Sequence, residues 1–231
     1  MIYDIPGKND DPQRVDAYGE MGRQLTDAAS GAREEILAET PYLAMMPGTF
    51  TVLRSLHDRG VRVRILTNSL AATDEPFAFS RYAMQRTELL EHGVELHEFM
   101  PHPTHHGEIV TRLARISEPT RLVLHAKTMV IDRRIVFVGS FNMDPRSTHL
   151  NTEMGVLIDS PELAAQIAAA IEHDMDSRNS WTVTRAVDDN RLVWTSVRDG
   201  QPQTTTQEPE VSAGALLELL FFTLLPIGNL I

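Results

Sequence analysis

Cysteine is absent from this chain of 231 residues, and lysine occurs only twice. Without cysteine, neither a disulfide framework nor a thiolate metal site can form, which fits a cytoplasmic protein. The first residues after Met1, IYDIPGKNDDPQ, are polar and contain no apolar segment of the kind found in a secretory signal. We therefore expect the protein in the cytoplasm or peripherally on the cytoplasmic membrane.

Positive charge is also scarce, because 21 Lys and Arg stand against 32 Asp and Glu, for a net charge of -11. An acidic surface repels a polyanion at long range, and proteins that bind nucleic-acid backbones are usually basic. The composition therefore argues against nucleic acid as a partner. A hydrophobic content of 42% is ordinary for a protein with a packed core.

Hydrophobic periodicity predicts strands that alternate with helices. The expected helices are 14–32, 51–59, 76–92 and 161–175, and the expected strands are 36–42, 61–66, 94–99, 122–131, 135–138 and 155–159. Residues 182–186 and 192–197 are expected to form a late hairpin. This alternation predicts an α/β domain over residues 1–200.

The C-terminal part has a different composition. Residues 201–210, QPQTTTQEPE, are expected to form a polar linker, and 211–231 an apolar segment. About twenty residues could span a bilayer, but Glu218 would cost about 2.5–3.5 kcal/mol at a helix centre and Pro226 interrupts the helix. Of three alternatives for this segment, we rank docking at a lipid interface highest, packing on the domain or a partner second, and spanning the bilayer third.

The most informative pattern begins at His125, Lys127 and Asp132. On the expected strand, residues two apart share a face, so His125 and Lys127 point the same way. An imidazole beside an ammonium suits a phosphate: the His can attack phosphorus or transfer a proton, and the Lys offsets oxygen charge. Asp132 ends the strand at a tight turn.

A second block of residues follows at a fixed distance and completes the pattern H-x-K-x4-D-x6-G-S-x-N. Gly139 is expected to let the backbone approach a ligand closely. Ser140 and Asn142 are expected to hydrogen-bond phosphate oxygens.

This pattern resembles the HKD signature of the phospholipase D superfamily. The flanking segments GVRVRILTNSLAATDEP and DPRSTHLNTEMGVLIDSPELA resemble the second repeat of bacterial cardiolipin synthase-type members. The resemblance implies a phospholipase D-like sandwich, with a mixed β-sheet flanked by helices and a single HKD repeat. It also implies a phosphohistidine intermediate, no metal or organic cofactor, and Glu153 as the residue that orients the motif histidine. On this reading Asp132 is more a turn residue than a catalyst.

The chain departs from that family in copy number and at one turn residue. The chemistry needs two such motifs, yet Lys8 has no His two residues before it, so a second H-x-K is absent. The chain could be a fragment, a split-gene product or a subunit, with the second motif supplied by a homodimer or an upstream half. Arg133 stands where the family often has Gly.

The resemblance implies a phosphatidyltransferase that acts on phospholipid at a membrane surface. The alternatives are a single-motif homodimeric phosphodiesterase or nuclease, and an inactive half-enzyme remnant. Whether His125 is the nucleophile or the acid–base residue stays open.

Weaker candidates surround the motif. A zinc site is conceivable at His102, His105 and His106, but a solvated loop is the preferred interpretation, and we predict no metal. Asn68 and Ser69 are candidates for the pocket rim. Core packing is preferred to a lipid groove for Tyr42 and Tyr82, and surface exposure to a headgroup contact for His149.

Overall fold

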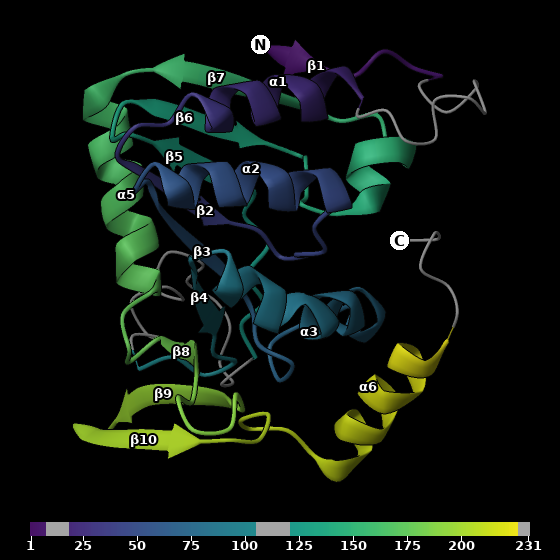
Figure 1. Ribbon diagram of the computed structural model, residues 1–231, viewed down its shortest axis with the longest axis vertical. Helices are drawn as coiled ribbons and strands as arrows, with labels where there is room; N and C mark the ends of the chain where they lie inside the picture. The colour runs from purple at the N-terminus through teal and green to yellow at the C-terminus, as the bar shows by residue number, and fades with distance from the viewer. Residues whose placement is uncertain (8–18, 105–120, 226–231) are drawn as a thin grey trace, which may run out of the picture.

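A computed structural model describes residues 1–7, 19–104 and 121–225, and it contains one ten-stranded sheet (Figure 1). The strand order is β1-β7-β6-β5-β2-β3-β4-β8-β9-β10. The central strands β2 (Glu35–Glu39), β3 (Arg62–Asn68) and β4 (Val94–Phe99) are parallel, and every other pairing in the described sheet is antiparallel. The flanking strands are β1 (Ile2–Tyr3), β5 (Thr128–Ile131), β6 (Ile135–Gly139), β7 (Met154–Asp159), β8 (Ser180–Arg185), β9 (Leu192–Arg198) and β10 (Gln201–Thr205).

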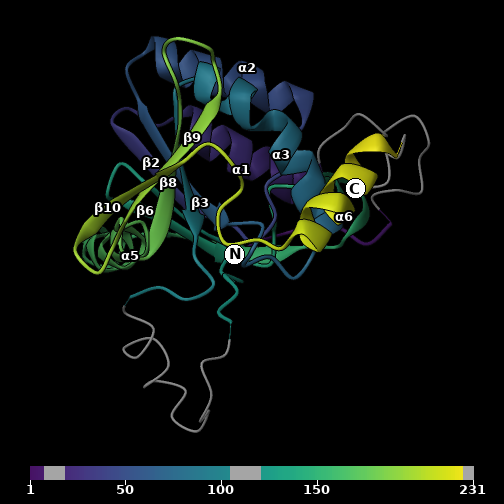
Figure 2. The ribbon, with the colours of Figure 1, turned by 90° about the horizontal axis from the view of Figure 1, so that it is seen from below.

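Helices cover both faces of this sheet (Figure 2). One face carries α1 (Glu20–Ser30), α2 (Pro47–Asp58) and α3 (Pro76–Glu91), and the opposite face carries α5 (Pro161–Asp174). Two further elements are the one-turn π-helix η2 (Arg146–Leu150) and α6 (Ala213–Leu224). The larger apolar core lies under α1–α3, and a smaller one, around Leu37, Val130 and Ile171, lies under α5.

The expected α/β class, with a mixed sheet flanked by helices, is confirmed. The late hairpin is present as β8 and β9. The helices expected to end before Gly60 and Gly93 do so, and both glycines have positive φ, +75° and +77°. That backbone conformation favours glycine and stops a helix. Part of the first expected helix falls in 8–18, outside the described residues.

The strand expected over 122–131 is shorter in the structure. Only Thr128–Ile131 forms β5, and 121–127 belong to no ladder. The Leu122 N–H donates to the Pro101 carbonyl at 2.9 Å, and Leu124 bonds to a side chain instead of a strand. Alternating apolar residues here reflect an extended segment that packs on the α5-side core, which mimics a strand in the sequence.

The polar stretch expected as a linker also differs. Its first half, Gln201–Thr205, pairs with β9 as the edge strand β10. The connecting Asp199 and Gly200 both have positive φ, +51° and +72°, as a two-residue hairpin turn requires. The Asp-Gly turn therefore sets the following residues beside β9, and they pair as a strand despite their low strand propensity.

Within the apolar C-terminal segment, Ala213–Leu224 form α6, which rests on α3 by one side. Residues 226–231 of that segment lie outside the described residues. The Phe222 and Phe77 rings lie 5.4 Å apart, and Leu219 packs against the main core. The other side exposes large apolar residues by 40–74%, namely Leu216, Leu217, Leu220, Phe221 and Leu224. Within the described ranges, no helix has the length and apolar character needed to cross a bilayer.

A buried charge cluster joins α3 to the late hairpin and to the connection before α6. The Arg86 side chain is 2% exposed and lies 2.9 Å from the carboxylate of Glu98, which is 0% exposed, and it also pairs with Glu208. Glu98 accepts hydrogen bonds from the Tyr82 hydroxyl at 2.8 Å and the Trp194 indole at 2.9 Å. Tyr82 is thus a core residue, as preferred from the sequence.

We predict that Arg86→Met destabilises the protein by about 3–5 kcal/mol, because it leaves Glu98 and Glu208 without their buried cation. Urea unfolding followed by circular dichroism measures this. The control is Arg62→Met, which removes an exposed pair with Glu95 and should cost at most about 1 kcal/mol. Equal losses in the two variants would contradict this account of the cluster.

Candidate active site

His125 and Lys127 lie at the sheet edge where β2 and β3 end and β5 begins. His125 is exposed and Lys127 is half-buried. The Lys127 Nζ donates to the His125 carbonyl at 3.2 Å. The Tyr42 ring lies edge-on to the His125 ring, with centroids 6.1 Å apart, and 6.0 Å from the Lys127 Nζ. An accessible imidazole and an ammonium therefore share one face beside an aromatic ring.

Asn68 fixes the segment that carries these two residues. Its side-chain Nδ2 donates to the Leu124 carbonyl at 3.0 Å, and its Oδ1 accepts from the Leu124 N–H at 2.9 Å. Asn68 is buried at the end of β3. It was a candidate for the pocket rim, but its side chain is used to hold the backbone one residue before His125.

The charge of Lys127 is balanced by carboxylates. Burial lowers the pKa of Lys127, while Glu153, Asp144 and Asp74 act to raise it. Asp144 is itself buried, which raises the pKa of its carboxyl group. Asp74 accepts a hydrogen bond from the Tyr42 hydroxyl at 3.1 Å. Tyr42 therefore lies at the site rather than only in the core.

Glu153 is the centre of a buried hydrogen-bond cluster. Its carboxylate accepts from Ser140 Oγ, from Ser147 Oγ at 2.8 Å and from Asn151 Nδ2 at 3.1 Å. Its own N–H donates to Asp4 at 3.1 Å. Among the hydrogen bonds of the described residues, none joins Glu153 to His125. Glu153 therefore contacts Ser140 and makes no hydrogen bond to the His125 ring among the described residues.

Two polar groups beside this cluster lack partners in the part of the chain that the structure describes. The Asn142 N–H donates to Ser147 Oγ at 3.0 Å, but its buried Oδ1 accepts no hydrogen bond. Both ring nitrogens of His149, on η2, are buried and likewise unpaired. Sequence reasoning preferred an exposed His149, whereas its nitrogens are enclosed.

Gly139 is required by packing. A Cβ at this position would lie 2.6 Å from the Met154 carbonyl oxygen and 2.8 Å from the Phe137 ring. Gly139 pairs with Gly155 across β6 and β7. We expected a ligand to approach the Gly139 backbone closely. In the structure the groups that lie close to it are the neighbouring strand β7 and the Phe137 ring.

The chain matches a known family over most of its length. The family model described as the cardiolipin synthase, PLD-like domain matches residues 25–175. The chain belongs to this family. Cardiolipin synthase C of Escherichia coli is 38% identical over 72% of the chain and 34% of its own length. The chain thus spans about a third of the length of the curated relatives it matches.

Solved structures share the fold at lower identity. Phosphatidylserine synthase of Haemophilus influenzae superposes with a TM-score of 0.54 at 14% identity, covering 89% of this chain and 43% of that one. NucT from Helicobacter pylori gives 0.52 at 16% identity, covering 75% of this chain and 92% of that one. Both confirm a phospholipase D-like fold for this PLD-like domain.

Asp132 lies at the far end of β5 from His125. Its carboxylate accepts hydrogen bonds of 2.8–3.1 Å from the N–H groups of Arg33, Glu34 and Glu35. Asp132 and Arg133 have φ of +49° and +51°. In the PLD-like domain Asp132 therefore anchors the β5–β6 turn to the start of β2. Arg133 holds a conformation that favours glycine and pairs with Glu35 and Glu172.

The histidine cluster considered for zinc lies partly outside the described residues, which include His102 but not His105 and His106. Elsewhere, within the described ranges, no group of three or more His, Cys, Asp or Glu residues could hold a metal ion.

We predict that His125→Ala abolishes phosphatidyl transfer and phosphodiester hydrolysis while the fold is kept, since no neighbouring group can replace a positioned imidazole. Lys127→Ala should slow turnover by a factor on the order of 10²–10³ through lost stabilisation of phosphoryl charge. Turnover of a soluble phosphodiester measures both, in the presence of a unit that carries a second motif where the chain alone is inactive. His57→Ala, an exposed histidine on α2, is the matched control. Unchanged turnover in pure His125→Ala would rule out the assignment.

Proposed function

We propose that this PLD-like domain contributes one HKD motif to a phosphatidyltransferase of the cardiolipin synthase type. The observation that carries the proposal is the accessible His125 ring beside the Lys127 ammonium at the sheet edge, in a chain that matches the cardiolipin synthase family. The 38% identity to a cardiolipin synthase supports lipid over other phosphodiesters. Phospholipid at a membrane surface is the proposed partner.

In the proposed reaction one motif histidine attacks phosphorus, and the bond to the leaving alcohol breaks. A second motif histidine protonates that alcohol and later removes the proton from the incoming headgroup hydroxyl, whose oxygen attacks phosphorus and breaks its bond to the first histidine. Lys127 offsets charge on the phosphoryl oxygens. The two histidines act in the same step on opposite sides of phosphorus, so one imidazole cannot serve both roles.

An exposed apolar patch beside the site supports a facing second unit. Tyr3 pairs with Met154, and Val138 pairs with Val156, so all four lie together on β1, β7 and β6. They are exposed by 37–58%. A contiguous apolar patch on a sheet face indicates an interface. The patch adjoins Ser140, because the Ser140 N–H donates to the Met154 carbonyl at 2.9 Å.

We predict that the 231-residue chain is not an active monomer. Sedimentation at micromolar concentration, run beside the activity assay, should show either a dimer with activity or an inactive, self-associating chain. Restoration by a partner that carries the second motif would favour a split enzyme over a homodimer. A monodisperse monomer with full turnover would refute the two-histidine requirement.

We also predict that α6 provides affinity for a lipid interface. Replacing Leu217 and Phe221 by Gln should lower co-sedimentation with phosphatidylglycerol vesicles, because both side chains are exposed and apolar while Leu219 and Phe222 keep the helix on the domain. Met84→Gln, an equally exposed apolar residue on α3, is the control. If the double variant binds vesicles as well as the original chain, α6 is only a packing helix.

The proposed function itself is tested by phosphatidyl transfer between phosphatidylglycerol molecules, with and without a unit carrying the second motif. Cardiolipin formation that His125→Ala abolishes is the expected result. Cleavage of single-stranded DNA without lipid turnover would instead establish the phosphodiesterase alternative.

A further inference from the structure

The hydrogen bonds of the described residues fix the backbone around His125 and leave its ring unheld. Asn68 bonds to the Leu124 backbone, and the Lys127 ammonium bonds to the His125 carbonyl, so both act on the main chain. Among the described residues, none forms a hydrogen bond with either nitrogen of the His125 ring. An exposed side chain with two rotatable bonds samples several rotamers unless a contact holds it. The orientation of the imidazole therefore depends on a contact of another kind.

Tyr42 makes a ring contact with His125. The two centroids lie 6.1 Å apart at an interplanar angle of 77°, which is a favourable T-shaped arrangement of two rings. The same tyrosine ring has its centroid 6.0 Å from the Lys127 Nζ, at the outer limit of a cation–π contact. One aromatic ring therefore borders both reactive groups, and it limits the orientations open to the imidazole.

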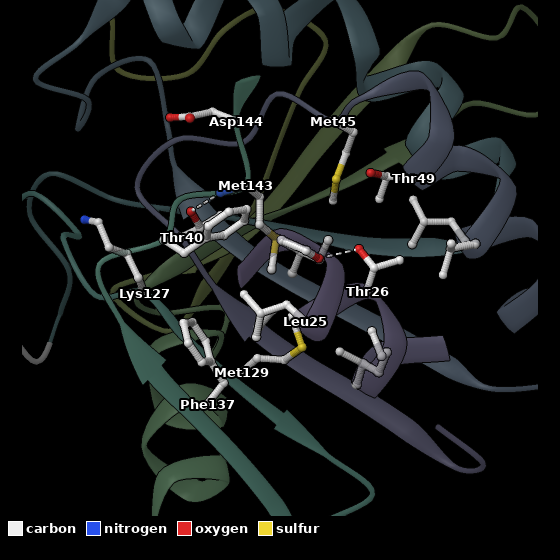
Figure 3. Close-up of a pocket in the computed structure, with 18 of the residues that line it drawn as sticks. Leu25, Thr26, Thr40, Met45, Thr49, Lys127, Met129, Phe137, Met143 and Asp144 are labelled. Atoms are coloured by element: carbon white, nitrogen blue, oxygen red, sulfur yellow. Dashed lines mark hydrogen bonds between the residues drawn. The ribbon is translucent and has the colours of Figure 1, made fainter. Parts of the chain in front are cut away.

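Tyr42 is itself held at its backbone and at its hydroxyl. The Thr40 hydroxyl accepts from the Met143 N–H at 3.4 Å (Figure 3) and donates to the Tyr42 carbonyl at 3.0 Å. The Tyr42 hydroxyl donates to the Asp74 carboxylate at 3.1 Å. Because both ends of this side chain are tied, its ring can act as a fixed wall beside the imidazole.

The turn after β3 places Asp74 beside Tyr42. The Ser69 carbonyl accepts from the Ala72 and Thr73 N–H groups at 3.0 and 2.9 Å, and the Ser69 hydroxyl accepts from the Ala72 N–H at 3.2 Å. Ser69, which the sequence suggested for the pocket rim, is buried and shapes this turn. The acceptor of the tyrosine hydroxyl is therefore part of a well-bonded loop.

The hydroxyl of Tyr42 serves as a tether and not as an acid or a base. Desolvation raises the pKa of Tyr42 most, and the Asp74 carboxylate raises it further. The phenol is therefore protonated at neutral pH, where it donates to Asp74. A role in the reaction falls to the aromatic ring, which faces the imidazole.

We infer that Tyr42, tethered by Asp74, is the residue that positions the His125 imidazole. The inference deepens the proposed function and rests on it, since ring orientation affects turnover only if His125 attacks phosphorus or transfers a proton. Such a step is slowed when the reacting nitrogen is free to turn away from the phosphate. The family resemblance gave this part to Glu153, which makes no hydrogen bond to the ring among the described residues.

The direct test is the mobility of the His125 ring, measured by ¹³C relaxation of labelled histidine in the full chain and assigned with His125→Ala. Tyr42→Leu removes the aromatic ring and should increase that mobility. Tyr42→Phe keeps the ring but loses the tether, and it should give an intermediate value. Phe50→Leu is the matched control, because Phe50 makes a comparable contact with the His92 ring, with centroids 5.4 Å apart. It should leave the His125 signal unchanged.

Substitutions at Asp74 separate the tether from its charge. Asp74→Ala removes the acceptor of the Tyr42 hydroxyl and should give the same intermediate ring mobility as Tyr42→Phe. Asp74→Asn keeps an acceptor without the charge and should behave as the original chain. Asp74 is exposed, so these two variants test the inference even if Tyr42→Leu fails to fold.

Turnover should follow the order of the ring. With a soluble phosphodiester, and with a unit that carries a second motif where the chain alone is inactive, Tyr42→Leu should lower kcat by a factor on the order of 10–10². KM should stay nearly unchanged, because the Lys127 ammonium keeps its bond to the His125 carbonyl. Tyr42→Phe should recover part of the lost kcat.

The outcomes separate this inference from the proposed function. A His125 ring that is as ordered in Tyr42→Leu as in the original chain overturns the inference, and so does an equal change in Phe50→Leu. Greater ring mobility with an unchanged kcat overturns it as well. Ring order is measured without turnover, so it decides the inference even where the phosphatidyl-transfer assay finds no product. Failure of the proposed function would appear in that assay and in unchanged turnover of His125→Ala.

Discussion

The position of His125 depends on two hydrogen bonds between the Asn68 side chain and the Leu124 backbone, 2.9 and 3.0 Å long. A carboxamide has a donor and an acceptor side by side, so the Asn68 side chain can make the two backbone hydrogen bonds that a neighbouring strand would otherwise make to Leu124. The Asn68 side chain thereby ties the chain before the motif to the end of parallel strand β3. Without it, residues 121–127 would have few backbone partners to hold the imidazole in place.

The other end of β5 is held by charge. The Asp132 carboxylate accepts hydrogen bonds from the N–H groups of Arg33, Glu34 and Glu35. Arg64 and Arg133 each form salt bridges with both Glu35 and Glu172. Arg133 occupies a backbone conformation that costs a non-glycine residue free energy, and its ion pairs offset part of that cost. β5 is therefore fixed by the Asn68–Leu124 pair before its start and by an ionic cluster at its end, and His125 and Lys127 lie between that pair and the first residue of β5.

Much of this arrangement follows from the sequence, because periodic segments and glycine stops mark α2, α3, α5 and the parallel strands. The motif spacing predicted a shared face for His125 and Lys127, and the family resemblance singled out Glu153, which lies in hydrogen-bond contact with Ser140. Three features could not be predicted. Asn68 meets Leu124 across 56 residues, and Arg86 meets Glu208 across 122, and no local pattern records such contacts. The late start of β5 at Thr128 could not be predicted, because an extended segment that packs on the core shows the same alternation of apolar residues as a strand. β10 could have been found from the Asp199-Gly200 turn, which outweighs its polar composition.

The electrostatics of the site give a physical reason for a second motif that is independent of the number of histidines. Lys127 is partly desolvated, and three carboxylates, Glu153, Asp144 and Asp74, already act on its charge. An anionic phosphodiester entering here meets repulsion from these carboxylates as well as attraction from Lys127. A facing unit that brings a second lysine and a protonated histidine would shift that balance towards binding. The carboxylates around Lys127 are consistent with the proposed second motif, whose lysine would add positive charge beside a bound phosphate.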